Sequence, residues 1–561
     1  MSPSFEEVVA QVTGPGSMFE IGDGTINGID QRVFVHAPPN MRSLFDIARM
    51  GGDKTFVVYD DQEWTFTEAM VQVDALGAAL VSHFGVKKGD RVAIAMRNYP
   101  EWVFSYAAIV SIGAVCVPLN AMWTEVELAY GIEHSGSTVM IADPERIERT
   151  AEVCERLGLR VLCARAAAGA GLGDHVERWE DVVEPGAPMP AVDISPDDDA
   201  TILYTSGTTG FPKGAVSTHS AILHAVLAFG ARAQVDKLRS DKPEDREDAE
   251  PIKPVFILIV PLFHVTGCVP VMLGSFVAHM ELVMMYKWDV DKALELIERH
   301  RVTHFTGVPT QSWDLVQSPR FAEFDTSSLR NVGGGGAPAP PTLVSQLADS
   351  VKAGGPIIGY GMTETNAYGP QNQGDDYLTH PSSTGRALPI VQVEIRDDDG
   401  NPLPVGKRGE ICMKGPNLFR GYWNDAEATA DTIVDGWLQT GDAGRLDEDG
   451  FLYVEDRIKD MILRGGENVY CAEVEAAIFE HPAVHEVAVV GVPNDRLGEE
   501  VAAVIFLEDG EQLGVDELTA FLDPKLARFK IPSRLAILDE PLPRNAAGKF
   551  LKRDLRDRFP S

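Results

Sequence analysis

The ten residues Thr205–Gly214 (TSGTTGFPKG) have the composition of a phosphate-binding loop. Glycines adopt positive φ at little cost and can turn backbone N–H groups inward to form an anion-binding nest. The hydroxyl groups and a lysine supply further donors for phosphate oxygens. The segment is not a Walker P-loop, because Gly214 follows Lys213 and the leading spacing differs. It follows the apolar run Thr201–Tyr204, and a helical pattern comes after it. The sequence therefore predicts a phosphate site here.

Three further segments carry carboxylates or glycines that could contact a ligand. Tyr360–Thr365 (YGMTET) contains a glutamate, and Mg²⁺ commonly takes one carboxylate plus substrate phosphates. Thr440–Asp442 (TGD) contains a carboxylate that can accept hydrogen bonds from two vicinal hydroxyls. Gly333–Pro338 (GGGGAP) allows close approach of the backbone to a ligand. Taken singly, each has an ordinary explanation: a helix cap, a common turn and a flexible turn.

Taken together and in this order, the segments resemble the motifs of the adenylate-forming superfamily. This superfamily includes acyl-CoA synthetases, aryl-CoA ligases, luciferases and peptide-synthetase adenylation domains. The resemblance extends from about Leu44 to Asp557 and includes three C-terminal segments: Asp456–Asp460 (DRIKD), Arg464–Asn468 (RGGEN) and Pro543–Lys549 (PRNAAGK).

The resemblance implies a role for individual residues. Adenine would lie against the ring of Tyr360 beside Gly361, Thr363 would contact the α-phosphate, and Glu364 would hold Mg²⁺. Asp442 and Arg457 would contact the ribose. The other implied nucleotide contacts are the loop residues Thr205, Ser206, Gly207, Thr208, Thr209, Gly210 and Lys213, and the adenine and acyl platform Gly335, Gly336 and Ala337.

For the C-terminal part, the resemblance implies a hinge with Lys459 as its pivot. Lys549 would bridge the acyl carboxylate and the α-phosphate, and Gly465 and Gly466 would approach the pantetheine channel of coenzyme A after a domain rotation. The chain departs from the family pattern at two positions. A typical member has glycine where Asp456 stands and proline shortly after the RGGEN segment, where this chain has Cys471.

The implied reaction has two steps. A carboxylate is a poor acyl donor, so its oxygen first attacks the α-phosphorus of ATP and expels pyrophosphate. Mg²⁺, the loop amides and Lys549 would stabilise the crowded negative charge. The small domain then swings, and the thiol of coenzyme A attacks the acyl-adenylate. ATP, Mg²⁺ and coenzyme A are therefore the expected cofactors.

The segment Pro261–Gly267 resembles the acyl-pocket segment of the family, with His264 bordering the carboxylate. Amino-acid-activating relatives have an aspartate at this position to hold the ammonium group, so an amino-acid substrate is disfavoured. The neighbouring residues Thr306–Thr310 and Asn366–Tyr368 are small or apolar. We expect an apolar tunnel bordered by His264, Gly307, Gly335 and Asn366.

Three alternatives stay open at this stage. A medium- or long-chain fatty acid leads, and an aryl, steroid or other bulky acid is the first alternative. The second is an acyl-AMP ligase that does not use coenzyme A. The third, a non-catalytic ATP- or acyl-binding protein, predicts loss of Lys213, Glu364 or Lys549, and all three are present.

Short apolar runs such as Arg91–Met96 alternate with helical patterns such as Trp102–Ile112, which indicates a largely parallel sheet covered on both faces. The predicted fold is α/β, with a large N-terminal domain of parallel-rich sheets covered by helices and a smaller, mobile α+β C-terminal domain. We predict a loop-rich N-terminal extension at 1–40, the AMP-binding domain at 41–458, and the small domain at 459–561, joined at Lys459.

The composition narrows the class of protein. The 561 residues are 44% hydrophobic and 24% charged, which excludes disordered, collagen-like and coiled-coil chains. A net charge of −35 argues against nucleic acid or an anionic membrane as partner. Six scattered cysteines without a C-x-x-C pair, and no export signal, predict a cytoplasmic protein; a homodimer stays open.

Two segments have an unusual content of charged residues. Val255–Ala278 contains no charged residue over 24 positions, but prolines and glycines interrupt it, so a buried strand, a turn and a buried helix are predicted rather than a membrane span. Asp236–Lys253 is rich in both charges and is predicted to be a solvated loop.

Overall fold

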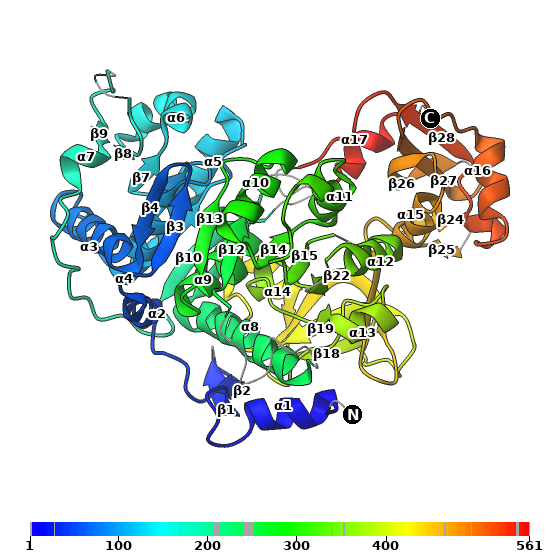
Figure 1. Cartoon of the computed structure of the whole chain (residues 1–561), viewed down its shortest axis with the longest axis horizontal. Coiled ribbons are helices and arrows are strands. Elements are labelled where there is room, and N and C mark those ends of the chain that lie inside the picture. Colours follow the sequence, from blue (N-terminus) through cyan, green and yellow to red (C-terminus); the bar gives the residue numbers. More distant parts are fainter. Residues whose placement is uncertain are drawn as a thin grey trace.

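The structure is a computed structural model that describes residues 3–26, 28–167, 169, 171–205, 212–240, 252–337, 339–351, 354–464, 467–494, 496–545 and 549–559. Within these residues the main body contains two eight-stranded sheets that are parallel except near some edges (Figure 1). In spatial order, the first sheet contains β20 (Gly421–Tyr422), β11 (Gly214–Thr218), β10 (Asp199–Tyr204), β6 (Val115–Pro118), β5 (Arg91–Ala95), β7 (Val139–Ala142), β8 (Arg160–Cys163) and β9 (Val176–Arg178). The second contains β17 (Gln371–Gln373), β16 (Gly355–Gly359), β15 (Asn331–Gly335), β14 (His304–Gly307), β12 (Val255–Leu258), β13 (Glu281–Met284), β3 (Thr55–Tyr59) and β4 (Gln62–Thr65).

Two smaller sheets follow along the chain. The first, antiparallel, contains β18 (Gln392–Arg396), β19 (Gly409–Lys414), β22 (Trp437–Leu446), β21 (Ile433–Val434) and β23 (Leu452–Arg457). The second forms the C-terminal unit, which stands apart in orange and red at the upper right of Figure 1: β25 (Glu467–Val469), β24 (Ile462–Arg464), β27 (Gly498–Leu507), β26 (Val484–Asn494) and β28 (Arg534–Leu538). Its buried side chains form clusters separate from the main core, which suits a unit that moves as a body.

The α-helices cover these sheets. They are α1 (Phe5–Thr13), α2 (Met41–Ala48), α3 (Phe66–Ser82), α4 (Pro100–Ser111), α5 (Glu125–Ser135), α6 (Pro144–Leu157), α7 (Trp179–Val182), α8 (His219–Arg239), α9 (Gly274–Val277), α10 (Val290–His300), α11 (Pro309–Gln317), α12 (Pro341–Ser350), α13 (Gly374–Thr379), α14 (Ala426–Thr432), α15 (Cys471–Phe479), α16 (Val515–Leu522) and α17 (Lys552–Arg556). The sequence fixes several of their ends: a capping box between Thr65 and Glu68, for example, begins α3.

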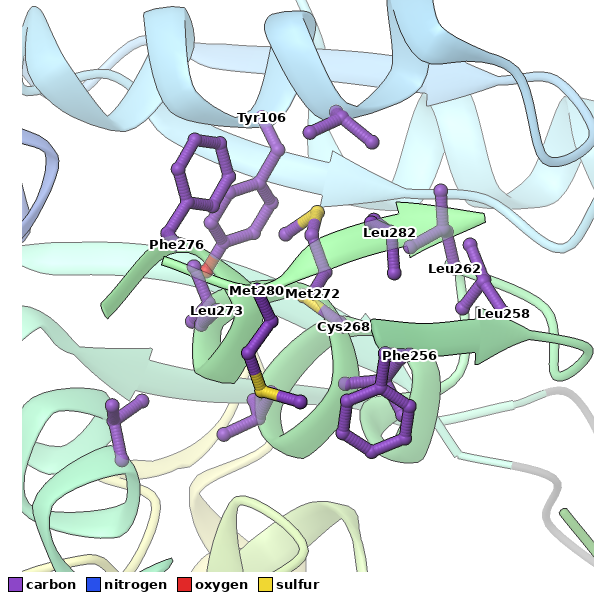
Figure 2. Packing of buried hydrophobic residues seen from close by; sticks show 14 of the residues in the cluster. Tyr106, Phe256, Leu258, Leu262, Cys268, Met272, Leu273, Phe276, Met280 and Leu282 are labelled. Carbon is purple, nitrogen blue, oxygen red and sulfur yellow. The ribbon is translucent and has the colours of Figure 1, made fainter. Parts of the chain in front are cut away.

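The main core joins the two large sheets. Helix α4 is buried along nearly its whole length, and its side chains belong to the same cluster as those of β5 in the first sheet and β3 in the second. Figure 2 shows Tyr106 of α4 beside Phe276 and Leu273, with Leu258 and Leu282 of the second sheet in the same cluster. This continuous apolar contact makes the two sheets one rigid support for the ends of their strands.

The apolar segment Val255–Ala278 folds as predicted. It forms β12, a turn, the π-helix η3 (Gly267–Leu273) and α9, all packed in the core. Among the described residues, no helix is both long and apolar enough to cross a bilayer.

One expectation about a surface segment is wrong, and a second is wrong over its first four residues. The region before residue 40 is not loop-rich where it is described: it contains α1 and the hairpin of β1 (Ile21–Ile26) and β2 (Ile29–Phe34). Helix α1 packs on α8, because the ring of Phe5 lies among the guanidinium groups of Arg232, Arg239 and Arg386.

The predicted loop at 236–253 begins as the last turn of α8, where the side chain of Asp236 is buried and pairs with Arg232 at 2.7 Å. Residues 241–251 lie outside the described part.

Candidate active site

The predicted site residues that the structure describes gather around one cavity of about 2880 Å³. It lies at the carboxyl ends of β12, β14, β15 and β16, the usual ligand position in parallel α/β sheets. The residues that border it are Thr205, Lys213, His264, Gly335, Gly336, Ala337, Tyr360, Gly361, Thr363, Glu364, Asp442, Arg457, Lys459 and Lys549. The predicted contacts Ser206, Gly207, Thr208, Thr209, Gly210, Gly465 and Gly466 lie outside the described residues.

The first motif is held at the end of a β-hairpin. Strands β10 and β11 are antiparallel, and the backbone N–H of Thr205 donates to the carbonyl of Lys213 at 2.9 Å. The ammonium group of Lys213 lies 4.9 Å from the ring centroid of Tyr422 on β20. Along the chain, β11 follows the motif and leads into α8. Its pairing with β10 and β20 fixes both ends of the loop.

The Gly333–Pro338 segment is a strand end where it is described, not a flexible turn. Gly333, Gly334 and Gly335 belong to β15. A Cβ on Gly334 would lie 1.9 Å from the carbonyl oxygen of Gly307, so only glycine permits this close approach of two strands. The backbone platform beside the cavity is consequently rigid.

Glu364 lies on the short helix η5 (Thr363–Thr365) and is buried. Its Oε1 accepts a hydrogen bond of 2.6 Å from the hydroxyl of Tyr422. Burial, together with the charge of Glu364, raises the pKa of Tyr422 far above its usual value, so the phenol remains a donor. Sequence reasoning did not identify Tyr422, since no local pattern links it to a partner 58 positions away.

The surroundings of Glu364 fit Mg²⁺. Its Oε2 makes no hydrogen bond with any described residue. The described part of the chain also has no cluster of three or more His, Cys, Asp or Glu that could hold a metal ion. A cation here would take its remaining ligands from substrate phosphates and water, which is the usual arrangement for Mg²⁺.

Asp442 is held between two partners. The hydroxyl of Tyr360 donates to Oδ2 at 2.6 Å, and Nε of Arg457 lies 2.8 Å from Oδ1. Asp442 and Arg457 are direct partners in the pairing of β22 with β23. Burial and the nearby Asp442 raise the pKa of Tyr360 well above its usual value. These contacts fix the carboxylate at the cavity wall.

Lys549 extends from the C-terminal unit into the cavity. Its Cε is 4.0 Å from where a Cβ on Gly336 would lie. Two hydrogen bonds with Asn545 hold the backbone at this turn: the Asn545 N–H donates to the Lys549 carbonyl at 2.8 Å, and the Lys549 N–H donates to Oδ1 at 3.0 Å. Burial and the positive charge of Arg457 lower the pKa of Lys549, and the charges of Asp442 and Glu364 partly offset this.

His264 faces Lys549 as a neutral ring. Its Nδ1 accepts a hydrogen bond of 3.3 Å from the backbone N–H of Thr266, so the ring proton is on Nε2. Burial, with a further contribution from Lys549, lowers the pKa of His264 to about 4. The imidazole can therefore donate one neutral hydrogen bond into the cavity near the lysine.

Two residues expected to border the acyl tunnel do not. A Cβ on Gly307 would meet the side chains of Gln311 and Ile259 at 2.5 and 2.8 Å, on the face of β14 away from the cavity. Asn366 is fully buried and donates to the carbonyl of Asn417 at 2.9 Å. Their sequence neighbours Thr306 and Ala367 border the cavity instead, and His264 and Gly335 border it as expected.

The two departures from the family pattern are in contact. The backbone N–H of Cys471 donates to the carboxylate of Asp456, which is at the end of β23. Asp456 also accepts from the N–H of Arg457 at 2.8 Å, so a proline in place of Cys471 would remove one of two backbone donors. Burial raises the pKa of Asp456 to about 6, and these two donors and the charge of Lys552 act in the opposite direction. The residues at 456 and 471 are thus linked by a hydrogen bond that glycine and proline at these positions could not form.

Comparisons with known proteins give the same family. Residues 44–423 match the AMP-binding enzyme family, and residues 473–549 match the AMP-binding enzyme C-terminal domain. The chain is 34% identical to the long-chain-fatty-acid–CoA ligase FadD13 of Mycobacterium tuberculosis (87% of this chain, 92% of the relative). It is 35% identical to a feruloyl-CoA synthase of Amycolatopsis sp. (91% and 97%) and 35% identical to a 3-[(3aS,4S,7aS)-7a-methyl-1,5-dioxo-octahydro-1H-inden-4-yl]propanoyl:CoA ligase of Mycobacterium tuberculosis (92% and 98%).

The solved structures agree with this. The ATP-bound MatB of Rhodopseudomonas palustris superposes with a TM-score of 0.80 at 32% identity, over 92% of this chain and 99% of that one. The match extends through both the main body and the C-terminal unit. With its two AMP-binding domains and a cavity that joins them, the chain belongs to the adenylate-forming superfamily and is an AMP-forming acid–CoA ligase.

Proposed function

We propose that the protein converts a medium- or long-chain fatty acid to its acyl-AMP with ATP, and then to its CoA thioester. The observation that carries this proposal is the cavity itself, which is bordered both by Lys549, Glu364 and Asp442 and by many apolar side chains. Among these apolar residues are Val226, Phe229, Phe256, Val277, Met280 and Leu343. An acid with a large apolar body would gain about 0.8 kcal/mol for each CH₂ buried there.

In the first half-reaction, Asp442 and Arg457 would bind the ribose and Tyr360 would contact the adenine. Bound Mg²⁺ would supply positive charge to the phosphates beside Glu364. Lys549 would contact both the acid carboxylate and the α-phosphate, and so stabilise the charge that builds up as pyrophosphate leaves. The neutral His264 would donate to the acid without competing with Lys549 for negative charge.

The second half-reaction requires a different geometry, because Lys549 occupies the space beside Gly336 that a thiol needs to reach. We place the hinge at Lys459, between domains at 41–458 and 459–561. Lys459 lies in an exposed turn directly after β23. A rotation there would withdraw Lys549 and present another face of the C-terminal unit to coenzyme A.

The hinge can be tested with Lys459→Pro. The neighbouring N–H groups of Ile458 and Asp460 donate to Gly441 and Arg457, but that of Lys459 has no acceptor among the described residues. Proline therefore removes no native hydrogen bond, yet it fixes φ near −65° and restricts the preceding residue. We expect near-normal acyl-AMP formation and a thioester step slowed by at least about ten-fold. An equal loss in both half-reactions would assign Lys459 a structural role and move the hinge elsewhere.

The proposed function is tested by incubating the protein with ATP, Mg²⁺ and a panel of acids, with and without coenzyme A, while AMP, pyrophosphate and acyl-CoA are measured. We expect pyrophosphate in both tubes and acyl-CoA only with coenzyme A. Acyl-AMP that never transfers would indicate a ligase that does not use coenzyme A. No product with any acid would indicate a binding protein and overturn the proposal.

A bulky cyclic acid is the second candidate. It is favoured by relatives of equal similarity that are named for feruloyl and for bicyclic propanoyl substrates. Including ferulic acid and a polycyclic propanoic acid in the panel separates the candidates by kcat/KM.

Chain length should be limited by Thr306, which borders the cavity on the strand next to the glycine platform. Thr306→Trp fills the passage, and overpacking penalises only an acid that reaches this depth. We expect kcat/KM for long acids to fall by about ten-fold or more while short acids are spared. Thr306→Val, which has nearly the same volume, is the matched control. The same long-to-short ratio in the folded Trp variant and in wild type would show that the acid does not pass Thr306.

A further inference from the structure

One layer of the second sheet borders the acyl cavity away from the reacting end. Phe256, His304, Asn331 and Gly355 are consecutive partners in the pairing of β12, β14, β15 and β16, and all four border the cavity. Partners in a parallel pairing share a face of the sheet. Asn331 begins β15 and Gly335 ends it, so this layer lies roughly 13 Å from the reacting end at about 3.3 Å per residue.

His304 presents one unsatisfied nitrogen to this end of the cavity. Its Nδ1 is 2.7 Å from the hydroxyl of Thr303, whereas its Nε2 makes no hydrogen bond with any described residue. The ring lies 5.2 Å from that of Phe256, which limits its rotation. Burial lowers the pKa of His304 to about 4, so the ring is neutral at neutral pH.

The hydroxyl of Thr303 decides whether Nε2 donates or accepts. Its single proton can go to the carbonyl of Val255 at 3.0 Å, which leaves the proton of His304 on Nδ1 and makes Nε2 an acceptor. It can instead go to Nδ1, which makes Nε2 a donor. A hydroxyl on the ligand can pair with Nε2 whether Nε2 accepts or donates. A keto oxygen can pair with Nε2 only when Nε2 donates.

Asn331 gives a second, independent observation at the same place. Asn331 borders the cavity beside His304, and its side-chain amide makes no hydrogen bond with any described residue. The amide can both donate and accept. The neighbouring Gly355 leaves room beside it, since a Cβ there would meet no atom within 4 Å. Both His304 and Asn331 are partly exposed to the cavity, so a ligand bound there can supply the partner that the protein does not.

We propose that His304 and Asn331 recognise an uncharged oxygen function, a hydroxyl or keto group, at the end of the acid remote from its carboxylate. The preferred substrates are then hydroxylated or oxo acids rather than acids with a plain hydrocarbon end. This inference rests on the proposed function, because it assumes that the acid lies along the second sheet. His304 and Asn331 do not themselves favour a second carboxylate, since a neutral imidazole and an amide offer no full positive charge to it.

The test compares kcat/KM for acyl-CoA formation across a length series of unsubstituted acids, ω-hydroxy acids, terminal keto acids and dicarboxylic acids. At the length that reaches His304, the hydroxy or keto acid should exceed the unsubstituted acid by about ten-fold, the value of one to two good hydrogen bonds. A preference for hydroxy over keto acids identifies Nε2 as an acceptor, and equal preference identifies it as a donor.

His304→Phe and Asn331→Leu keep side-chain volume and remove the polar atoms. Each variant should bring the ratio of kcat/KM for the hydroxy or keto acid to kcat/KM for the unsubstituted acid towards one. Activity on the unsubstituted acid should persist. His304→Gln places an amide near the position of Nε2 and should restore part of the preference. His83→Phe is the matched control, because His83 is half exposed and does not border the cavity. Thermal unfolding of each variant checks that it is folded.

Three results would overturn the inference: no preference for an oxygenated acid at any length in wild type, a preference for the dicarboxylic acid, or a preference that survives both His304→Phe and Asn331→Leu. In each case turnover of some acid to acyl-CoA would leave the proposed function intact. Absence of turnover with every acid would instead remove the proposed function itself.

Discussion

Replacing Lys549 by alanine is expected to slow acyl-AMP formation by about 10²–10³-fold and to leave the reaction of supplied acyl-AMP with coenzyme A nearly unchanged. The lysine lies beside Gly336 in a buried place, where a positive charge acts more strongly on an anionic transition state than it would in water. Lys549 contributes nothing to the attack of the coenzyme A thiol on the acyl-adenylate if the C-terminal unit must first withdraw this lysine from the cavity. Single-turnover assays of the two half-reactions measure both rates.

Two variants control this experiment. Lys525→Ala removes a positive charge from the same C-terminal unit but away from the cavity, and should leave both rates unchanged. Lys549→Arg keeps the charge but brings a larger, planar group, so it should recover only part of the adenylation rate. If Lys549→Ala slowed both half-reactions equally, the idea that one cavity serves two successive geometries would have to be abandoned.

Replacing Glu364 by glutamine is expected to lower the rate of acyl-AMP formation by about 10²–10³-fold and to raise the Mg²⁺ concentration needed for half-maximal rate. Glutamine keeps an oxygen that can accept from Tyr422 but removes the negative charge that a cation needs. The measurement is the initial rate of pyrophosphate release as a function of total Mg²⁺.

Tyr422→Phe separates the charge of Glu364 from its orientation. The phenol fixes one carboxylate oxygen at 2.6 Å, so its loss should weaken Mg²⁺ by about 10- to 100-fold, less than loss of the charge itself. An unchanged Mg²⁺ dependence in Glu364→Gln would show that the cation is held elsewhere. A larger effect from Tyr422→Phe than from Glu364→Gln would make the tyrosine, not the carboxylate, the main contact.

Much of the fold could be read from local patterns. The runs at Arg91–Met96 and Trp102–Ile112 form β5 and α4 within two residues of their predicted ends, because a buried apolar strand and a helix between sheets are encoded by neighbouring residues. The segment before residue 40 was predicted less well. Its helix α1 depends on the packing of Phe5 against arginines of α8 and against Arg386. Partners so distant in the sequence leave no local pattern from which the helix could be predicted.

The sequence by itself determined which residue types could do the chemistry: a motif lysine, a carboxylate for Mg²⁺, a carboxylate for ribose and a second lysine near the C-terminus. It also determined the family, because the order of those motifs is written along the chain. The structure places the described members of that set around one cavity, which no spacing in the sequence requires.

Only the tertiary structure decided which side chains face the cavity. Side chains alternate across a strand, so a difference of one position changes the face, and the pairing of β14 directs Thr306 and His304 into the cavity and Gly307 away from it. The same pairing brings Asn331 beside His304, and the pairing of β11 with β20 brings Tyr422 to Glu364. These neighbours are far apart along the chain and meet because backbone hydrogen bonding fixes the register of the sheets, which is a property of the folded molecule as a whole.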